Sequence, residues 1–314
     1  MKKRMICLTA AAGLMFFMLA APALLQAGTE ERINESFEVK PGGRLSLNSE
    51  LGSVEIRTHK ANRVDVQVIK KSRRPGDKKT LSEFFVRMDK VGGNVDITGD
   101  FHRKGLSQVW SRLRNRLKVS YIITVPKEYD LELKTTGGSI KVESIEGMVN
   151  ARSTGGGLYF GTVRGDLMGR TTGGGIKCQS VEGNADLGTT GGGIETGYIN
   201  GSIKAHTTGG SISITEANGF IRAKTTGGSI RAGIARQPLR DCYLKTTGGS
   251  VTLYMDEDLG FDLNARTTGG RISSDFRMTL DGLIDKRAIS GRLNQGGPEL
   301  YIRSTGGGIT LKSR

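Results

Sequence analysis

The sequence has few aromatic residues, few prolines and few cysteines. Aromatic side chains make up 6% of its 314 residues and hydrophobic ones 36%, which is low for a globular enzyme. Only 6 prolines accompany 47 glycines, and this imbalance indicates many tight turns rather than a disordered linker. Of the 3 cysteines, only Cys178 and Cys242 lie beyond the N-terminal segment. Two cysteines do not form a disulfide scaffold.

Common catalytic and metal-binding patterns are also missing from the sequence. The three histidines, His59, His102 and His206, lie in unrelated contexts, and no Ser-His-Asp motif is present. The recurrent Gly-Gly turns precede strands, whereas a phosphate-binding loop is single and opens a helix. The turns also lack the regular carboxylates of calcium-binding β-rolls. We therefore expect no cofactor and no metal; a polysaccharide-active β-helix enzyme with scattered catalytic residues is the alternative.

Residues 1–27 have the pattern of a secretory signal peptide. Three basic residues at 2–4 precede an apolar run, and Leu-Gln-Ala at 25–27 fits a cleavage site. A membrane anchor is the alternative, because the run is of borderline length. Pro22 and the small residues near the end of the run favour cleavage. The sequence thus predicts export to the periplasm or to the cell exterior.

The chain is strongly basic, with a formal net charge of +15 at pH 7. This excess favours acidic partners such as an anionic polysaccharide, lipopolysaccharide or a membrane surface. Because the signal peptide predicts export, we expect no nucleic-acid partner.

Glycine pairs recur every 18 residues between 137–138 and 227–228. A fixed period of this size predicts a solenoid. Each unit contains two nonamers with glycine in the fourth place and apolar residues in the sixth and eighth, as in Gly138, Ile140 and Val142. The apolar alternation predicts strands, and we expect each glycine to form a corner by adopting positive φ. The fold class is therefore all-β, a parallel β-solenoid of about 18 residues per coil.

The regularity of the repeat divides the mature chain into two parts. Residues 28–134 are interpreted as an irregular N-terminal part of the solenoid, with a basic insertion at 101–118. A separate small β-domain is the alternative for this part. Residues 135–314 hold the regular repeats, with an insertion near 271–303 before a last STGGGITL coil. Terminal units of solenoids are commonly irregular because they shield the open ends.

Several segments resemble a known bacterial family of adhesins that carry a domain of unknown function (DUF4097-like). They are FEVKPGGRLSLNSELGSVEI (37–56), YIITVP (121–126), the T-x-G-G-x-I turns and GRLNQGGPELYIRSTGGGITL (291–311). The resemblance covers nearly the whole mature chain, and its motifs are structural. It implies an exported β-solenoid with a role in adhesion or envelope organisation, and it supplies no catalytic residues.

A basic residue precedes nearly every Thr-Thr or Ser-Thr pair of the repeat. These residues are Lys134, Arg152, Arg170, His206, Lys224, Lys245, Arg266 and Arg303, and Gly188 takes the equivalent place in one coil. Equivalent places stack in a solenoid, so we expect a ladder with one charge per about 4.8 Å. Such a ladder suits a linear polyanion or a membrane surface. The alternative is a solvated edge that discourages edge-to-edge pairing.

The insertion at 101–118 is a second basic element without any acidic residue. Its candidate surface-docking residues are Arg103, Lys104, Trp110, Arg112, Arg114, Arg116 and Lys118. Apolar residues near helical spacing predict a basic amphipathic helix, which could lie on a membrane. A helix that packs on the solenoid is the alternative.

The remaining cysteines are predicted to be free thiols. Cys178 occupies an inward eighth place, and Cys242 lies about three coils later, or about 14 Å away. A disulfide requires Cα atoms within about 7 Å. Taken together, the sequence predicts a non-enzymatic exported β-solenoid that acts as an adhesin or cell-envelope scaffold and docks on anionic glycan or lipid.

Overall fold

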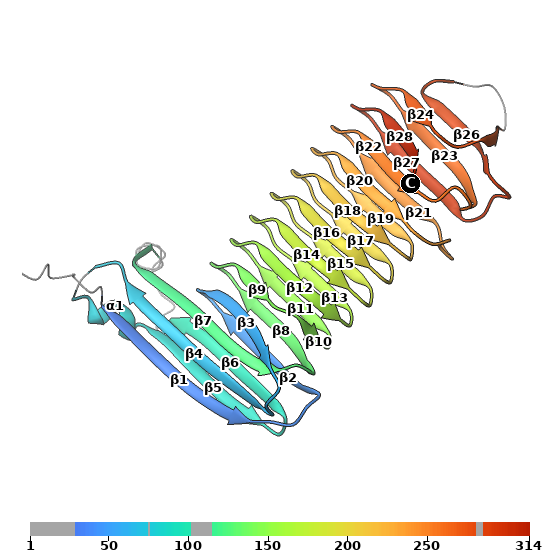
Figure 1. Cartoon of the computed structure of the whole chain (residues 1–314). Coiled ribbons are helices and arrows are strands. Elements are labelled where there is room, and N and C mark those ends of the chain that lie inside the picture. Colours follow the sequence, from blue (N-terminus) through green and yellow to red (C-terminus); the bar gives the residue numbers. More distant parts are fainter. Residues whose placement is uncertain (1–28, 75, 102–114, 281–284) are drawn as a thin grey trace, which may run out of the picture.

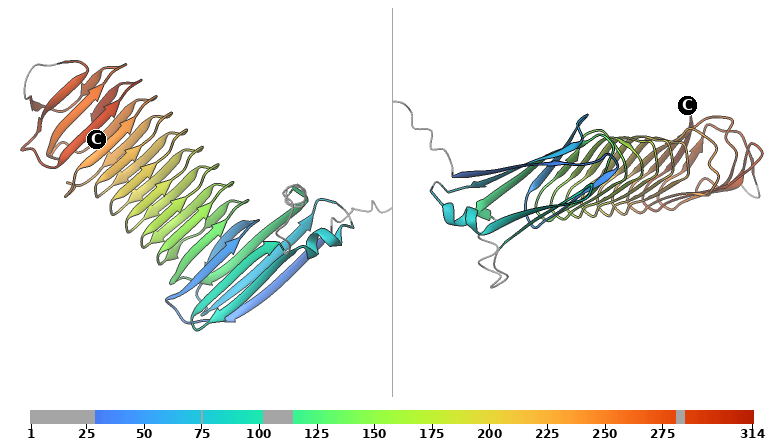
Figure 2. Two further views of the ribbon diagram at one scale, coloured as in Figure 1. Left: turned by 180° about the vertical axis from the view of Figure 1, so that it is seen from behind. Right: turned by 90° about the horizontal axis from the view of Figure 1, so that it is seen from below.

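The computed structural model describes residues 29–74, 76–101, 115–280 and 285–314. Within these residues, two sheets of 14 strands each lie face to face in an elongated stack (Figures 1 and 2). The predicted signal peptide and residues 102–114 of the basic insertion lie outside the described residues. In the part of the chain that is described, no helix has the length and apolar character needed to cross a membrane.

Sheet A begins at the N-terminal end of the stack. In spatial order it contains β1 (Glu30–Glu38), β4 (Arg63–Ser72), β7 (Leu117–Pro126), β3 (Ser53–His59), β9 (Ile140–Val142), β12 (Leu158–Arg164), β14 (Ile176–Val181), β16 (Ile194–Ile199), β18 (Ile212–Ala217), β20 (Ile230–Ile234), β22 (Val251–Met255), β28 (Ile309–Ser313) and β24 (Ile272–Ser274), with β10 (Ile145–Glu146) paired to β12.

Sheet B covers the other side of the core. From the same end it contains β5 (Phe84–Val91), β6 (Asn94–Phe101), β2 (Gly43–Ser49), β8 (Tyr129–Thr135), β11 (Val149–Ser153), β13 (Leu167–Arg170), β15 (Ala185–Gly188), β17 (Ile203–His206), β19 (Ile221–Lys224), β21 (Cys242–Thr246), β27 (Glu299–Ser304), β23 (Phe261–Thr267), β26 (Ala288–Leu293) and β25 (Met278–Leu280).

In the repeats, the chain passes from sheet A to sheet B and back once per coil. β14 and β15 form one coil, and β16 and β17 form the next, with Ile176 opposite Ile194 in sheet A. In sheet B, Ala185 lies opposite Ile203. The pairing is parallel, which confirms the predicted β-solenoid. Inward-pointing Ile, Val, Leu and Ala side chains fill the space between the two sheets.

A row of buried hydroxyl groups connects the Thr-Thr-Gly-Gly corners of successive coils. The first Thr or Ser of each corner donates a hydrogen bond to a glycine carbonyl in the neighbouring coil, over 2.5–2.8 Å. Thr207, for example, donates to the carbonyl of Gly192 and also accepts from the amide of Gly210. The second Thr of the corner, such as Thr208, is exposed. The repeated hexamer is therefore a structural corner in which the first hydroxyl has a defined acceptor.

The reason for glycine in these corners differs from the one predicted. None of the described Thr-Thr-Gly-Gly corners has a glycine with positive φ. Instead, a Cβ on the second glycine would meet the backbone of the neighbouring coil: at Gly210 it would lie 2.3 Å from the carbonyl oxygen of Gly192. Close approach of the coils excludes a side chain there. Positive φ occurs in the opposite corner, at Gly147 and Gly165.

The last coil in the sequence is not the last coil in the stack. β27 pairs with β21 on one side and β23 on the other, and β28 lies in the same way between β22 and β24. The chain thus skips one place after β22, forms β23 to β26, and returns to fill the place with its C-terminal coil (Figure 1). The C-terminal segment is therefore interior to both sheets.

Both ends of the stack use antiparallel pairing. β1, β4 and β7 are antiparallel at one end of sheet A, as are β5 and β6 in sheet B. At the other end, β26 is antiparallel to β23 and β25. Beside β5 lies the short helix α1 (Lys78–Ser82). The buried Lys70 donates to the carbonyls of Leu81 and Phe84 and contacts Glu31 at 2.8 Å, which ties β4 to the segment around this helix.

Candidate anion-binding face

The eight basic residues that precede the corners form one row across the outer face of sheet B. The register runs Lys134, Arg152, Arg170, Gly188, His206, Lys224, Lys245, Arg303 and Arg266, each opposite the next. We call these eight basic residues the cation row. It spans nine strands, or about 38 Å at about 4.8 Å per strand. In spatial order Arg303 precedes Arg266, because the C-terminal coil is inserted between β21 and β23.

Gly188 does not leave an empty place in this row. A Cβ built on Gly188 would lie 3.0 Å from the side chain of Arg170, so the Arg170 side chain covers the glycine. From there the Arg170 guanidinium contacts Asp186 at 2.7 Å and also donates to the backbone carbonyl of Asp186. Arg170 is therefore the member of the row whose charge is neutralised within the protein.

The other seven members have no such partner. Among the described residues, none of them has a carboxylate within 4.0 Å. Most are exposed, and Lys245 is half-buried. The positive charge of the row is therefore not balanced by carboxylates among the described residues. Like charges on neighbouring strands repel each other, and an anionic partner would neutralise them.

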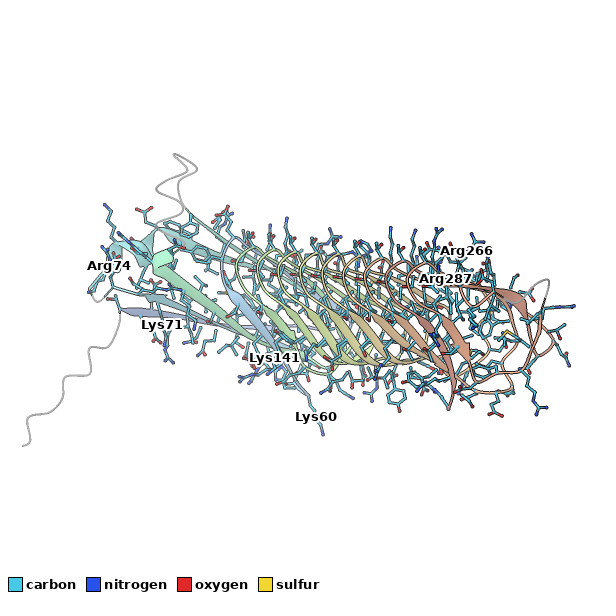
Figure 3. The ribbon with its side chains drawn as sticks, turned by 90° about the horizontal axis from the view of Figure 1, so that it is seen from above. Lys60, Lys71, Arg74, Lys141, Arg266 and Arg287 are labelled. Carbon is cyan, nitrogen blue, oxygen red and sulfur yellow. The ribbon has the colours of Figure 1, made fainter. Side chains whose placement is uncertain are left out.

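Sheet A carries basic residues as well, but several of these are paired. Lys141 and Arg57 contact Glu55 at 3.4 Å and 3.2 Å. Lys177 contacts Glu195 at 2.8 Å, and this hydrogen bond raises the pKa of Lys177. Lys141 and the row member Arg266 lie on opposite sides of the stack (Figure 3). Several cations of sheet A are thus paired with carboxylates, whereas in the cation row only Arg170 has such a partner among the described residues.

A second set of outward residues runs beside the cation row, two positions earlier in each strand. Lys204 and Arg222 belong to it and add positive charge next to the row. Tyr243 and Tyr301 follow in the same register, and their rings stack with centroids 5.0 Å apart. Sequence reasoning did not identify these residues, because they have no repeated motif; only the strand register places them together.

The same face has a hollow of about 410 Å³ toward the corner opposite the cation row. Its apolar lining includes Met148, Met168 and Phe220, and Lys204 and Arg240 add positive charge to it. We call it the sheet-B hollow. Met148 and Met168 are unusually exposed for large apolar side chains, at 60% and 38%.

The predicted surface-docking segment is only partly within the described residues. Arg103, Lys104, Trp110, Arg112 and Arg114 lie outside them. Arg116 is half-buried just before β7. Lys118 is exposed in β7, opposite Lys71 of β4. Lys118 therefore belongs to sheet A and does not share a face with the cation row.

A groove of about 770 Å³ crosses the outer face of sheet A. Tyr159, Lys177, Glu195 and Glu143 are among its lining residues. Glu143 follows β9 and Glu195 lies in β16, three strands further along the sheet, so they are about 14 Å apart along the stack. The carboxyl groups of glycosidases are separated by about 5–9.5 Å. These two carboxylates therefore do not form such a pair.

The two described cysteines are free and buried, as predicted. Cys178 lies in sheet A and Cys242 in sheet B. Burial raises the pKa of Cys178 to about 12 and that of Cys242 to about 11. In the described ranges, no group of three or more His, Cys, Asp or Glu side chains is arranged to hold a metal ion.

Comparison with known proteins gives one strong match, to a family model. The model of the Toastrack DUF4097 family matches residues 43–312. No curated protein matches the chain significantly.

Solved structures with similarity to the chain have low sequence identity. A "putative adhesin" from Bacteroides fragilis is 13% identical, with 90% of this chain and 97% of that chain covered and a TM-score of 0.37. A "putative lipid binding protein" from Parabacteroides distasonis is 12% identical, with 91% and 98% covered and a TM-score of 0.44. A "putative cell adhesion protein" from Clostridium sporogenes is 13% identical, with 90% and 100% covered and a TM-score of 0.21. At these scores the similarities bear on neither ligand nor activity.

Proposed function

We propose a binding role rather than a catalytic one for this chain, which belongs to the Toastrack DUF4097 family. In this proposal it is an exported β-solenoid that acts as an adhesion or cell-envelope scaffold module. Its outer sheet B face docks on an anionic surface of the envelope through the cation row.

The observation that carries the proposal is the cation row itself. Six lysine and arginine side chains and His206, none with a carboxylate partner among the described residues, follow one line along the stack. Their repulsion is relieved when anionic groups of a polymer or a membrane lie along the same line. Each contact of this kind contributes modestly, so the affinity depends on many contacts made at once.

The mechanism requires that binding weakens with salt. Exposed charges interact over a distance of about 8–10 Å at physiological ionic strength, and higher salt shortens that distance. Binding through the cation row should therefore be strong in low salt and weak in high salt. Arg170 should contribute least, because Asp186 already neutralises it.

The proposal is tested with polygalacturonate, a soluble acidic polysaccharide, in low and high salt. The test variant replaces Lys134, Arg152, Lys224 and Lys245 of sheet B by Ser. The matched control replaces Lys141, Lys177, Arg231 and Lys312 of sheet A by Ser, which removes the same charge from the other face. We expect about tenfold or greater weakening in the first variant and little change in the control. Equal affinities for the two variants would contradict the proposal.

A further inference from the structure

We propose that the anionic partner of the sheet B face is a lipid membrane, with the apolar side chains around the sheet-B hollow entering its hydrocarbon boundary. This inference rests on the proposed function and names the partner of the same face. It commits to an anionic membrane lipid rather than a soluble acidic glycan.

The first argument is where exposed apolar side chains lie. Met148, Met168 and Leu239 are 60%, 38% and 97% exposed. Met148 and Met168 line the sheet-B hollow, and Leu239 directly precedes Arg240, which lines it too. Met148 and Met168 belong to neighbouring coils, whereas Leu239 lies before β21, beyond the other end of the hollow. Large exposed apolar side chains on one surface mark a site that contacts another apolar body. An acidic polysaccharide offers these side chains no apolar counterpart.

The second argument is the position of the hollow relative to the cations. It extends over β11, β13, β15 and β17 and reaches Phe220 just before β19, and these strands carry Arg152, Arg170, His206 and Lys224 of the cation row. Lys204 and Arg240 also line it. Apolar side chains flanked by cations on one surface fit the boundary between acyl chains and anionic head groups.

The carboxylates in the hollow are occupied within the protein. Asp186 pairs with Arg170 at 2.7 Å. Asp166 accepts hydrogen bonds from the backbone amide and the side chain of Asn184, at 2.8 Å and 3.3 Å. Asp166 keeps its negative charge, because both of its hydrogen-bond donors are neutral. With Asp186 paired to Arg170, the two lining cations Lys204 and Arg240 exceed Asp166 by one positive charge.

The aromatic residues beside the row fit the same interpretation. Arg222 lies with its guanidinium 5.9 Å from the ring of Phe220, which lines the hollow. Tyr243 and Tyr301 are half-buried in the adjoining strands, with an apolar ring body and a polar tip. Side chains of this kind sit favourably at the level of lipid head groups.

Acidic residues limit the docking region at its C-terminal end. Asp241, Glu299 and Asp262 occupy the same edge from β21 onward, where the amide of Glu299 donates to Asp241 over 2.9 Å. Anionic lipid would be repelled there. The membrane contact is therefore expected to centre on β11 to β19.

The experiment uses the full chain and vesicles of phosphatidylcholine, with or without phosphatidylglycerol, in a co-sedimentation assay. The test variant is Met148→Ser/Met168→Ser/Leu239→Ser, which changes exposed side chains only. The control is Tyr159→Ser/Tyr198→Ser, which removes exposed aromatic rings, 44% and 60% exposed, from sheet A. Thermal unfolding of each variant verifies that the fold is retained.

We expect the wild-type chain to bind vesicles that contain phosphatidylglycerol and the test variant to bind them about tenfold more weakly. The test variant should bind polygalacturonate as well as the wild-type chain does, and the control should bind both normally. Unchanged vesicle binding by the test variant, or wild-type binding to polygalacturonate alone, would overturn the lipid inference and leave the proposed function standing. If removal of the four row cations affected neither probe, the proposed function would fail, and this inference with it.

Discussion

Lys245 of β21 and Arg303 of β27 lie directly opposite each other in sheet B, although β22 to β26 separate them in the sequence. The contact exists because the C-terminal coil fills a place in the middle of the stack. The continuity of the cation row across this point therefore depends on the last residues of the chain. Without the inserted coil, the row would be interrupted between Lys245 and Arg266.

The inserted coil should also be essential for stability. Removal of residues 299–314 takes away four fully buried side chains, Leu300, Ile302, Ile309 and Leu311. Each contributes about 1.5–3 kcal/mol by burial, in a domain whose stability is about 5–15 kcal/mol. We expect the truncated chain to lose its cooperative thermal transition. The control is Arg303→Ser in β27, which should retain the thermal transition. A truncated chain with the same thermal transition as this control would contradict the inserted topology.

The hydroxyl row makes a prediction about a single corner. In Thr207→Val, the carbonyl of Gly192 loses a buried hydrogen bond of 2.7 Å. The expected cost is about 1–3 kcal/mol in the free energy of unfolding, measured in urea. Thr208→Val changes the exposed neighbour and should have little effect.

The same substitution at Thr196 should act in the opposite direction. The Thr196 hydroxyl is buried and has no hydrogen-bond partner among the described residues. Its neighbours in register are Cys178 and Ile214, which are apolar positions. Thr196→Val should therefore stabilise the protein by about 1 kcal/mol. If both valine variants shifted stability in the same direction, the assignment of hydroxyl partners would be wrong.

The two glycines of a corner should differ in how strongly their substitution by alanine destabilises the protein. A Cβ at Gly210 would lie 2.3 Å from a backbone oxygen, whereas at Gly209 the nearest atom would be 2.9 Å away. Because φ is not positive at either residue, the space between coils decides the cost. Gly210→Ala should destabilise by about 1–3 kcal/mol or more, and clearly more than Gly209→Ala, in thermal unfolding. The reverse order would favour a conformational role for the first glycine.

The buried thiols predict a loss of stability at alkaline pH. Burial raises the pKa of Cys178 to about 12 and that of Cys242 to about 11, from an ordinary value of 9.0. Above pH 9 the unfolded chain releases these protons and the folded chain retains them, so the stability present below pH 9 declines as the pH rises toward 11. The expected loss is about 1 kcal/mol per thiol by about pH 10. Replacement of both cysteines by Ala should reduce the decline of the urea-measured stability between pH 9 and pH 10, while the raised pKa values of the buried Tyr121 and Tyr129 still lower stability at higher pH. An unchanged decline between pH 9 and pH 10 would contradict the assignment.

The sequence was sufficient for the architecture of the repeats and for the alignment of the cation row. Both follow from an 18-residue period, because Arg152 and Arg170 must stack when each coil has the same length. The position of the C-terminal coil within the stack could not be predicted, because its corner resembles every other corner and no local feature specifies which strands flank it. The role of Gly210 was misread for a related reason: the atoms that exclude a side chain belong to another coil.

The sheet-B hollow and the Tyr243–Tyr301 stack were also not predictable from the repeat. Met148, Met168 and Phe220 occupy places that are polar in other coils, so no repeated motif marks them. Their proximity depends on register between strands, together with the excursion that brings Arg240 to the edge of the hollow. Features that recur could be predicted, and features that occur once could not.

The most direct test of the central claim is lysine acetylation of the wild-type chain, free and saturated with polygalacturonate, followed by mass spectrometry. For each lysine the ratio of modification in the two states is compared, so differences in intrinsic reactivity cancel. We predict strong protection of Lys134, Lys224 and Lys245 in sheet B, and little protection of Lys141 and Lys177 in sheet A. Equal protection of both faces, or protection of Lys141 and Lys177 alone, would contradict the assignment of sheet B as the binding face.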